Sequence, residues 1–130
     1  KSGWCPVDQL TFESKLHKGI HVIGDSAIAG SMPKSGFSAS NQAKITASAI
    51  IALLNEKAPT SATMANTCYS FLSQDYAISV SAIYQLSGKE IVSVKGSGGI
   101  SSLDADLSVR RAEAIYAQGW YDSITNDMFG

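Results

Sequence analysis

The sequence predicts an α+β fold: a strand and a long helix, then a small antiparallel sheet of about three strands and a C-terminal helix. Between residues 37 and 57, alanine, isoleucine and leucine recur with helical spacing. Alternation of apolar and small polar residues begins near residue 68, and a helical pattern returns after residue 104. Because strands and helices are grouped in the second half, that half is typical of an α+β unit.

The composition excludes several classes of function. A length of 130 residues suits one domain, and 45% hydrophobic content argues against wholesale disorder. A net charge of −1 provides no basic surface for nucleic acid. The longest apolar stretch, 47–54, is far shorter than the roughly 20 residues of a membrane span. The two cysteines lack CxxC spacing and a nearby histidine ligand, so we expect no metal site.

The first predicted strand is the apolar run Gly19–Asp25, which has a glycine near each end. Short continuous apolar runs are typical of buried strands in mostly parallel sheets, so we expect this one to close an α/β unit. The preceding residues are polar and irregular, with a short alternating edge strand at 11–15.

The first helix is predicted from Phe37 to about Lys57, where apolar residues recur three and four positions apart. Few of its positions are polar, so we expect it to be largely covered. Either Ser35 or Ser38 can cap its first turn, and Pro59 ends it.

A β-hairpin is predicted from the alternating segments 76–84 and 90–95, which flank a turn at Gly88–Lys89. Residues 68–72 supply a third strand. The glycine-rich residues 96–99 form a flexible turn.

The last helix is predicted to open at Asp104 or Asp106 and to run to about Asn126. We interpret the paired arginines Arg110 and Arg111 as a solvated face of this helix.

Two neighbouring segments are candidate ligand-binding elements. Gly24 and Asp25 end the first predicted strand, and a carboxylate at the carboxyl end of a sheet strand can accept hydrogen bonds from sugar or ribityl hydroxyls. Asp25 can equally cap the following turn. The segment Lys34-Ser35-Gly36 leads into the helix start, where free amides and the helix dipole favour negative charge. It is also compatible with an ordinary loop.

Cys68 is the candidate redox residue, because a thiolate can attack or form disulfides; it can equally be a small buried apolar residue. Cys5 has the same two interpretations and can also pair with Cys68 in a structural disulfide. Trp120 either completes a core or stacks on a planar ligand.

Five segments together resemble the flavoprotein subunit of flavocytochrome c sulfide dehydrogenase, including the second flavin motif of that family. The resemblance extends from Gly3 to Gly130 and is carried by Gly3–Asp8 with Thr11–Ser14, Ile20–Asp25, Met32–Ala39, Asn66–Ser70 and Trp120–Ile124. It departs from the family pattern in the order of residues 38–42.

The resemblance implies a glutathione-reductase-like flavoprotein of the periplasm. Such a protein oxidises hydrogen sulfide and passes electrons through FAD to a c-type cytochrome subunit, which makes it a sulfide-cytochrome-c reductase. It implies that residues 1–57 are the C-terminal segment of the FAD-binding domain and that 58–130 form the C-terminal α+β domain at the flavin. No membrane span and no nucleic-acid partner are expected.

The resemblance also implies roles for individual residues. Asp25, after Gly24, would bind the ribityl chain. Lys34, Ser35, Gly36 and Phe37 would place the helix start near the pyrimidine edge of the flavin. Cys68 would be half of a redox disulfide, and Trp120 would lie against the flavin at the sulfide pocket.

The chain has no GxGxxG half and no second redox cysteine, and it begins at Lys1 without an initiator methionine. We therefore expect the C-terminal third of a longer enzyme, a piece that alone binds no FAD, has no activity and self-associates through exposed apolar surface. The alternative is a standalone periplasmic binding module held by a Cys5–Cys68 disulfide. A sulfide:quinone reductase is disfavoured, because the charge pattern of the last helix is too mixed for membrane association.

Overall fold

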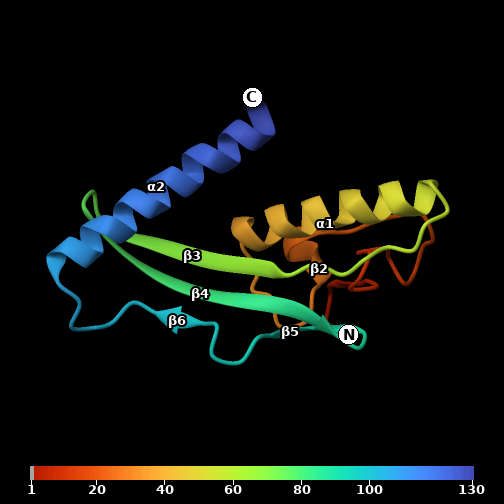
Figure 1. The fold of residues 1–130 in the computed structure, drawn as a ribbon, viewed down its shortest axis with the longest axis horizontal. Helices are drawn as coiled ribbons and strands as arrows, with labels where there is room; N and C mark the ends of the chain where they lie inside the picture. The colour runs from red at the N-terminus through yellow and green to blue at the C-terminus, as the bar shows by residue number, and fades with distance from the viewer. Residues whose placement is uncertain (1) are drawn as a thin grey trace.

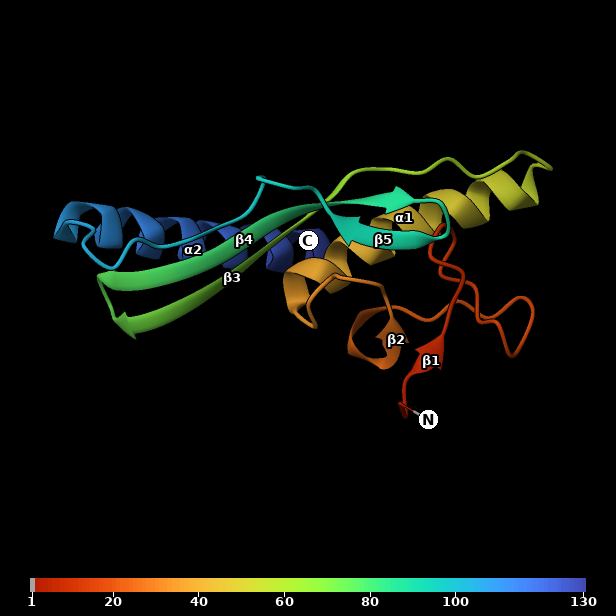
Figure 2. The ribbon, with the colours of Figure 1, turned by 90° about the horizontal axis from the view of Figure 1, so that it is seen from below.

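The computed structural model describes residues 2–130 and confirms the α+β class. A long β-hairpin runs through the molecule, with one helix near each of its ends (Figure 1). The N-terminal segment packs beside one end of the hairpin, and the C-terminal helix covers the other end (Figure 2).

The N-terminal segment contains a two-stranded parallel sheet, in which β1 (Cys5–Pro6) pairs with β2 (Ala27–Ile28). The predicted strand Gly19–Asp25 is wrong: its backbone bonds to the preceding loop instead of to a sheet, as in the bond from Val22 N to Phe12 O at 2.9 Å. The predicted edge strand at 11–15 is likewise reduced to isolated bridges.

Gly24 explains why the apolar run does not continue as a strand. Its φ of +70° lies in the left-handed region and turns the chain into a short 3-10 helix, η1 (Gly24–Ser26). Asp25 therefore lies in a turn before β2, and not at the carboxyl end of a sheet strand.

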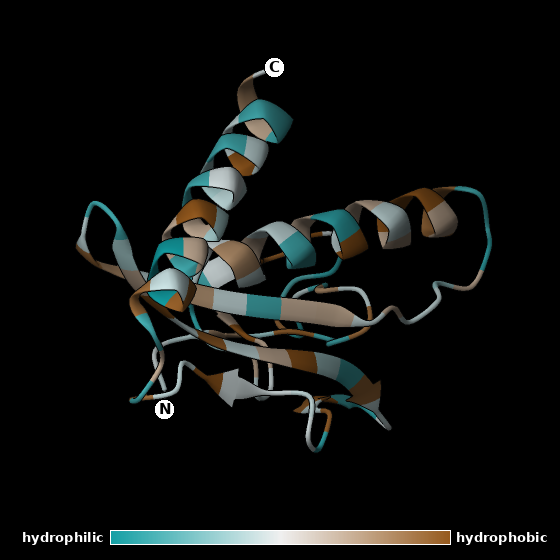
Figure 3. Ribbon diagram, turned by 60° about the vertical axis from the view of Figure 1, so that its left-hand side comes forward, coloured by the Kyte–Doolittle hydropathy of each residue, from teal (hydrophilic) through white to brown (hydrophobic). Residues whose placement is uncertain are grey.

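Helix α1 (Gly36–Leu54) begins one residue before the predicted start at Phe37 and ends three residues earlier than expected, with Ser35 as its N-cap. Its buried residues are mostly polar, contrary to the predicted apolar contact face: Ser38, Gln42, Thr46 and Ala49. The C-terminal end of α1 contains strongly hydrophobic residues (Figure 3). Their large side chains are exposed, that of Leu54 by 80%. The expectation of a largely covered helix is therefore wrong for its last turns.

The second half forms a four-stranded antiparallel sheet within the described residues. The order is β3 (Met64–Ser73), β4 (Tyr76–Ser87) and β5 (Glu90–Ser93). A fourth strand that the sequence did not predict, β6 (Gly99–Ile100), pairs with β4 at Val80 and Ser81.

Helix α2 (Leu107–Phe129) packs across β4 and β3, and its C-terminal end projects beyond the sheet (Figure 1). Asp106 holds the N-cap position, although its side chain makes no capping hydrogen bond.

The main hydrophobic core joins the two halves of the chain. Phe12 and Ile91 are almost fully buried in it, and its other members are Val7, Ala27, Ala29, Met32, Met64 and Tyr84. Residues on both sides of the predicted boundary at 57/58 thus share one core, and the boundary itself stays a prediction.

Candidate functional site

The predicted site residues gather around the N-terminus of α1. Ser35 accepts a hydrogen bond from the Ser38 amide at 3.1 Å and so satisfies one free donor of the first turn. The amides of Gly36 and Phe37, the first two residues of the helix, have no intrahelical acceptor available. This helix end therefore presents N–H donors together with the positive end of the helix dipole.

Phe37 and Trp120 bring α2 against this helix start. Their rings stack with centroids 5.5 Å apart and planes inclined by 11°. A Cβ atom added at Gly36 would lie 3.6 Å from the Trp120 ring, so glycine leaves the indole close to the helix backbone. The two rings line a groove of about 200 Å³ between α1 and α2.

Gly24 and Asp25 lie beside the second turn of the same helix. The Gly24 amide donates to Gln42 Oε1 at 2.7 Å, and its Cα faces the Ala39 methyl group. The buried Gln42 side chain therefore holds the turn against α1, while Asp25 is exposed.

The ammonium group of Lys34 is bound by groups of the same chain. The Nζ atom donates to the Ala27 carbonyl at 3.2 Å and to the Asp25 carbonyl, and it lies 3.9 Å from the centroid of the Trp4 ring. Lys34 therefore fixes the shape of the loop that leads from η1 to α1.

Cys68 is connected to the helix start through Asn66, which is 3% exposed. Asn66 Nδ2 donates to Cys68 Sγ at 3.3 Å, and Asn66 Oδ1 accepts from the Ser38 hydroxyl at 3.0 Å. The Ser35 hydroxyl donates to the same oxygen. Asn66 and Ser38 were not predicted as site residues. The signal was their spacing, because residues two apart on a strand share a face and residues three apart on a helix are neighbours.

Cys68 and Trp120 lie on different sides of β3. Trp120 lines a hollow with Tyr69 and Phe71, and the side chains of Tyr69 and Cys68 point to opposite faces of the strand. Within residues 2–130, Cys68 and Trp120 form no hydrogen bond with one another. Cys68 therefore reaches the N-terminus of α1 through Asn66, and Trp120 reaches it through Phe37.

Tyr84 is the titratable neighbour of Cys68. Burial raises the pKa of the Tyr84 phenol, and the Cys68 sulfur adds to this rise. Both cysteines of the chain are free thiols, and the Cys5–Cys68 disulfide of the alternative hypothesis is not formed. Cys5 instead contacts the Ser14 hydroxyl at 3.6 Å.

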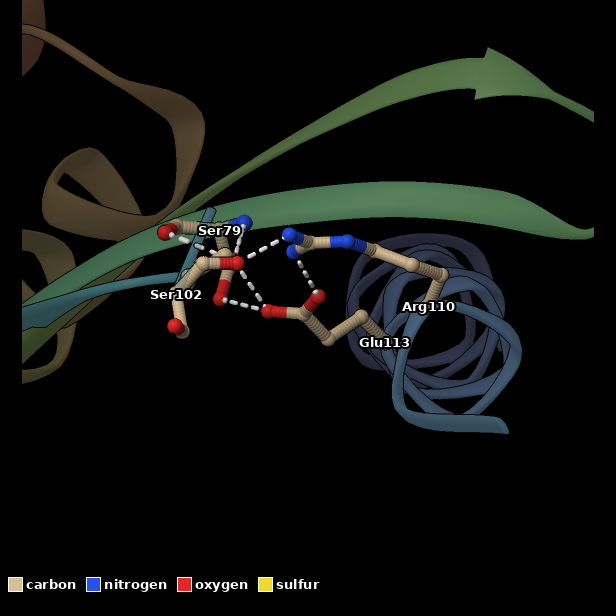
Figure 4. Close-up of polar contacts among 5 residues, drawn as sticks. Ser79, Ser102, Arg110 and Glu113 are labelled. Carbon is tan, nitrogen blue, oxygen red and sulfur yellow. Dashed lines mark hydrogen bonds and ion pairs between the residues drawn. The ribbon is translucent and has the colours of Figure 1, made fainter. Parts of the chain in front are cut away.

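Arg110 is buried, so its interpretation as a solvated residue is wrong, whereas Arg111 is exposed as expected. Arg110 Nη1 donates to Glu113 Oε2 at 3.1 Å, and Nη2 donates to the Ser102 carbonyl (Figure 4). Glu113 also accepts from the hydroxyls of Ser79 and Ser101.

The Ser101 hydrogen bond is the main cause that lowers the pKa of Glu113, with smaller contributions from Ser79 and Arg110 against the opposing effect of burial. The network joins β4, the β6 region and α2. It is a structural clamp away from the α1 N-terminus.

Within residues 2–130, no group of three or more histidine, cysteine or acidic side chains could hold a metal ion. None of the described helices combines the length and apolar character that crossing a membrane requires.

A comparison with protein families identifies the second half of the chain. The family model described as flavocytochrome c sulphide dehydrogenase, flavin-binding, matches residues 60–129, which is more than half of the 130 residues. The match includes Cys68, its neighbour Asn66 and Trp120. The chain therefore belongs to the flavin-binding family of flavocytochrome c sulphide dehydrogenase.

Proposed function

We propose that this chain is the C-terminal part of a periplasmic flavoprotein that oxidises hydrogen sulfide and passes the electrons to a c-type cytochrome subunit. The observation that carries the proposal is the connection between Cys68 and the N-terminus of α1 in a chain of a flavin-binding family. The Cys68 sulfur and a helix end that favours negative charge are thereby connected through a single side chain, that of Asn66.

The chemistry of the donors at this helix end fits one edge of FAD. The Gly36 and Phe37 amides favour an electron-rich ring edge, and the exposed Asp25 carboxylate can accept from ribityl hydroxyls. Ser35 keeps the helix start in place, and Gly24 permits the turn that carries Asp25. Lys34 contributes by shaping the loop, since its ammonium group is already engaged by the chain.

When bound, FAD would supply a two-electron acceptor that can release its electrons one at a time. The role of Cys68 is to form a disulfide with a cysteine from another part of the complete protein. Hydrosulfide attacks the sulfur of that other cysteine, which becomes a persulfide, while the S–S bond breaks and its electron pair stays on Cys68 as a thiolate. Trp120, stacked on Phe37, provides an aromatic wall beside the helix end.

The test uses the complete gene product, purified and examined for bound flavin and for sulfide-dependent reduction of a c-type cytochrome. We expect an oxidised flavin spectrum and cytochrome reduction in the wild type. Replacement Cys68→Ser should abolish sulfide turnover while flavin stays bound, because serine can form no disulfide. Cys5→Ser is the matched control and should retain turnover.

Either of two results would contradict the proposal. A complete gene product that binds no flavin would exclude the flavoprotein role. A Cys68→Ser variant with wild-type sulfide turnover would remove the assigned redox thiol.

A further inference from the structure

The Asn66 side chain has a fixed orientation, which its hydrogen bonds determine. Its Oδ1 atom accepts from two hydroxyl groups, those of Ser35 and Ser38. Ser35 Oγ already accepts from the Ser38 amide at 3.1 Å, so its proton is free for Asn66. With both hydroxyls directed at the carbonyl oxygen, the NH₂ group must face Cys68.

The buried amide therefore presents an N–H donor to one particular sulfur. Asn66 is 3% exposed, so water offers little competition for this bond. Hydrogen bonds strengthen when the acceptor is charged, so the amide favours a sulfur that carries negative charge over a neutral one. The contact thus stabilises the form of Cys68 that acts as leaving group and nucleophile.

We propose that Asn66 is a positioning residue that holds the Cys68 sulfur toward the N-terminus of α1 and stabilises negative charge on it. This inference rests on the proposed function for its place in sulfide oxidation, but the contact itself does not depend on it. Asn66 acts through Cys68 and Ser35, and it is not itself assigned a contact with substrate.

Asn66→Asp separates this role from a purely structural one. The carboxylate can still accept from the Ser35 and Ser38 hydroxyls, so the link to α1 is kept. Its second oxygen replaces the N–H donor and places negative charge beside Cys68. A second variant, Asn66→Leu, removes the donor with similar branching and without adding charge, and it serves if the aspartate variant does not fold.

Asn41 offers a matched control, because it also joins α1 to β3. Its Oδ1 accepts from the Ala65 amide at 3.2 Å and its Nδ2 donates to the Phe37 carbonyl at 3.1 Å. In the described part of the chain, Asn41 makes no hydrogen bond to Cys68. Asn41→Asp therefore perturbs the same pair of elements without changing the donor at the sulfur.

The measurement is the alkylation rate of Cys68 relative to Cys5 in the reduced complete gene product, followed by mass spectrometry of the two cysteine peptides. Cys5 is an internal reference in every sample, since it contacts Ser14 and not Asn66. We expect the Cys68/Cys5 rate ratio to fall by at least about fivefold in Asn66→Asp and Asn66→Leu. It should stay at the wild-type value in Asn41→Asp.

A folded Asn66→Asp or Asn66→Leu variant with the wild-type rate ratio would overturn the proposal, as would an equal fall in Asn41→Asp. A second readout is sulfide-dependent cytochrome reduction. In this assay Asn66→Leu should lower kcat and leave the KM for sulfide nearly unchanged. A raised KM at unchanged kcat would contradict the proposed role of Asn66. If the wild type binds no flavin and consumes no sulfide, the proposed function fails, while the alkylation ratio still decides the role of Asn66.

Discussion

Two buried polar side chains, Asn66 and Arg110, each connect separate segments of the chain through hydrogen bonds, but the segments that they connect have different roles. Each is 3% exposed and each is held by several hydrogen bonds, as buried polar groups must be. Asn66 joins the start of α1 to the sulfur of Cys68, the proposed redox thiol. Arg110 joins α2 to the Ser102 carbonyl and pairs with the Glu113 carboxylate of the same helix. Burial alone therefore does not distinguish a site residue from a structural one.

The Arg110 clamp predicts a large loss of stability on substitution. Arg110→Met leaves Glu113 with a mostly buried charge and no ionic partner, which should lower the free energy of unfolding by about 3 kcal/mol. Arg111→Met is the control, because Arg111 and Asp75 are both exposed and 3.6 Å apart; it should cost less than about 1 kcal/mol. Urea unfolding of the chain followed by circular dichroism measures both. Equal losses in the two variants would contradict the assignment of Arg110 as a clamp.

The N-terminal segment and β5 are joined by a close approach of their backbones. Ser31 N donates to the Ile91 carbonyl at 2.9 Å, and Gln9 accepts from the Ile91 amide at 2.6 Å. Gly30 lies between these contacts, and a Cβ atom there would overlap the Ile91 carbonyl oxygen. The contact between loop and strand therefore requires glycine.

Gly30→Ala should consequently lower the free energy of unfolding by about 2 kcal/mol or more, since both the backbone contact and a φ of +58° oppose a side chain. Gly88→Ala is the matched control: its φ is +63°, but the added methyl group meets nothing within 4 Å. Only conformational strain remains there, and the loss should be about 1 kcal/mol. Thermal or urea unfolding compares the two, and a Gly30→Ala loss no larger than that of Gly88→Ala would refute the close-approach argument.

The elements that the sequence predicts well are those whose local pattern and tertiary environment agree. The alternation in 76–84 and the Gly88–Lys89 turn predict the hairpin, because period two and a turn glycine are local properties. The strand at Gly19–Asp25 fails because its backbone bonds to Phe12 and Ser14, which the apolar run does not encode. The prediction that apolar residues form the buried side of α1 fails for the same reason. The polar side chain of Gln42 is buried there, where it accepts a hydrogen bond from the distant Gly24 amide.

The sequence singles out residues that the structure brings near the N-terminus of α1, but it does not single out Asn66 and Ser38, which connect Cys68 to that helix end. The family resemblance implies that Cys68 and Trp120 each lie beside the flavin, and the structure places them on different sides of β3. Their common reference is the α1 N-terminus, which Trp120 reaches through Phe37 and Cys68 through Asn66. Such a connection depends on which residues of β3 lie beside the first turn of α1. No local pattern in the sequence specifies that position.

At the scale of the whole molecule, one group of apolar side chains stays exposed outside the hydrophobic core. At the C-terminal end of α1, Ile51 and Leu54 are 62% and 80% exposed, and Leu54 lines a hollow together with Ile50, Leu53 and His21. Contiguous apolar surface of this kind favours association in water. In the 130-residue chain, a second copy is the simplest partner available to cover it.

We therefore expect the mean mass of the chain, measured by light scattering, to rise with concentration. The double variant Ile51→Lys/Leu54→Lys should move it toward the monomer, because it places two charges on this surface without entering the core. Leu103→Lys is the control, since Leu103 is 96% exposed in a loop away from α1 and should leave the association unchanged. A wild-type chain that stays monomeric over the whole concentration series would show that this surface does not drive association. If Leu103→Lys disperses the assembly as effectively as the double variant, net charge is the cause and not the end of α1.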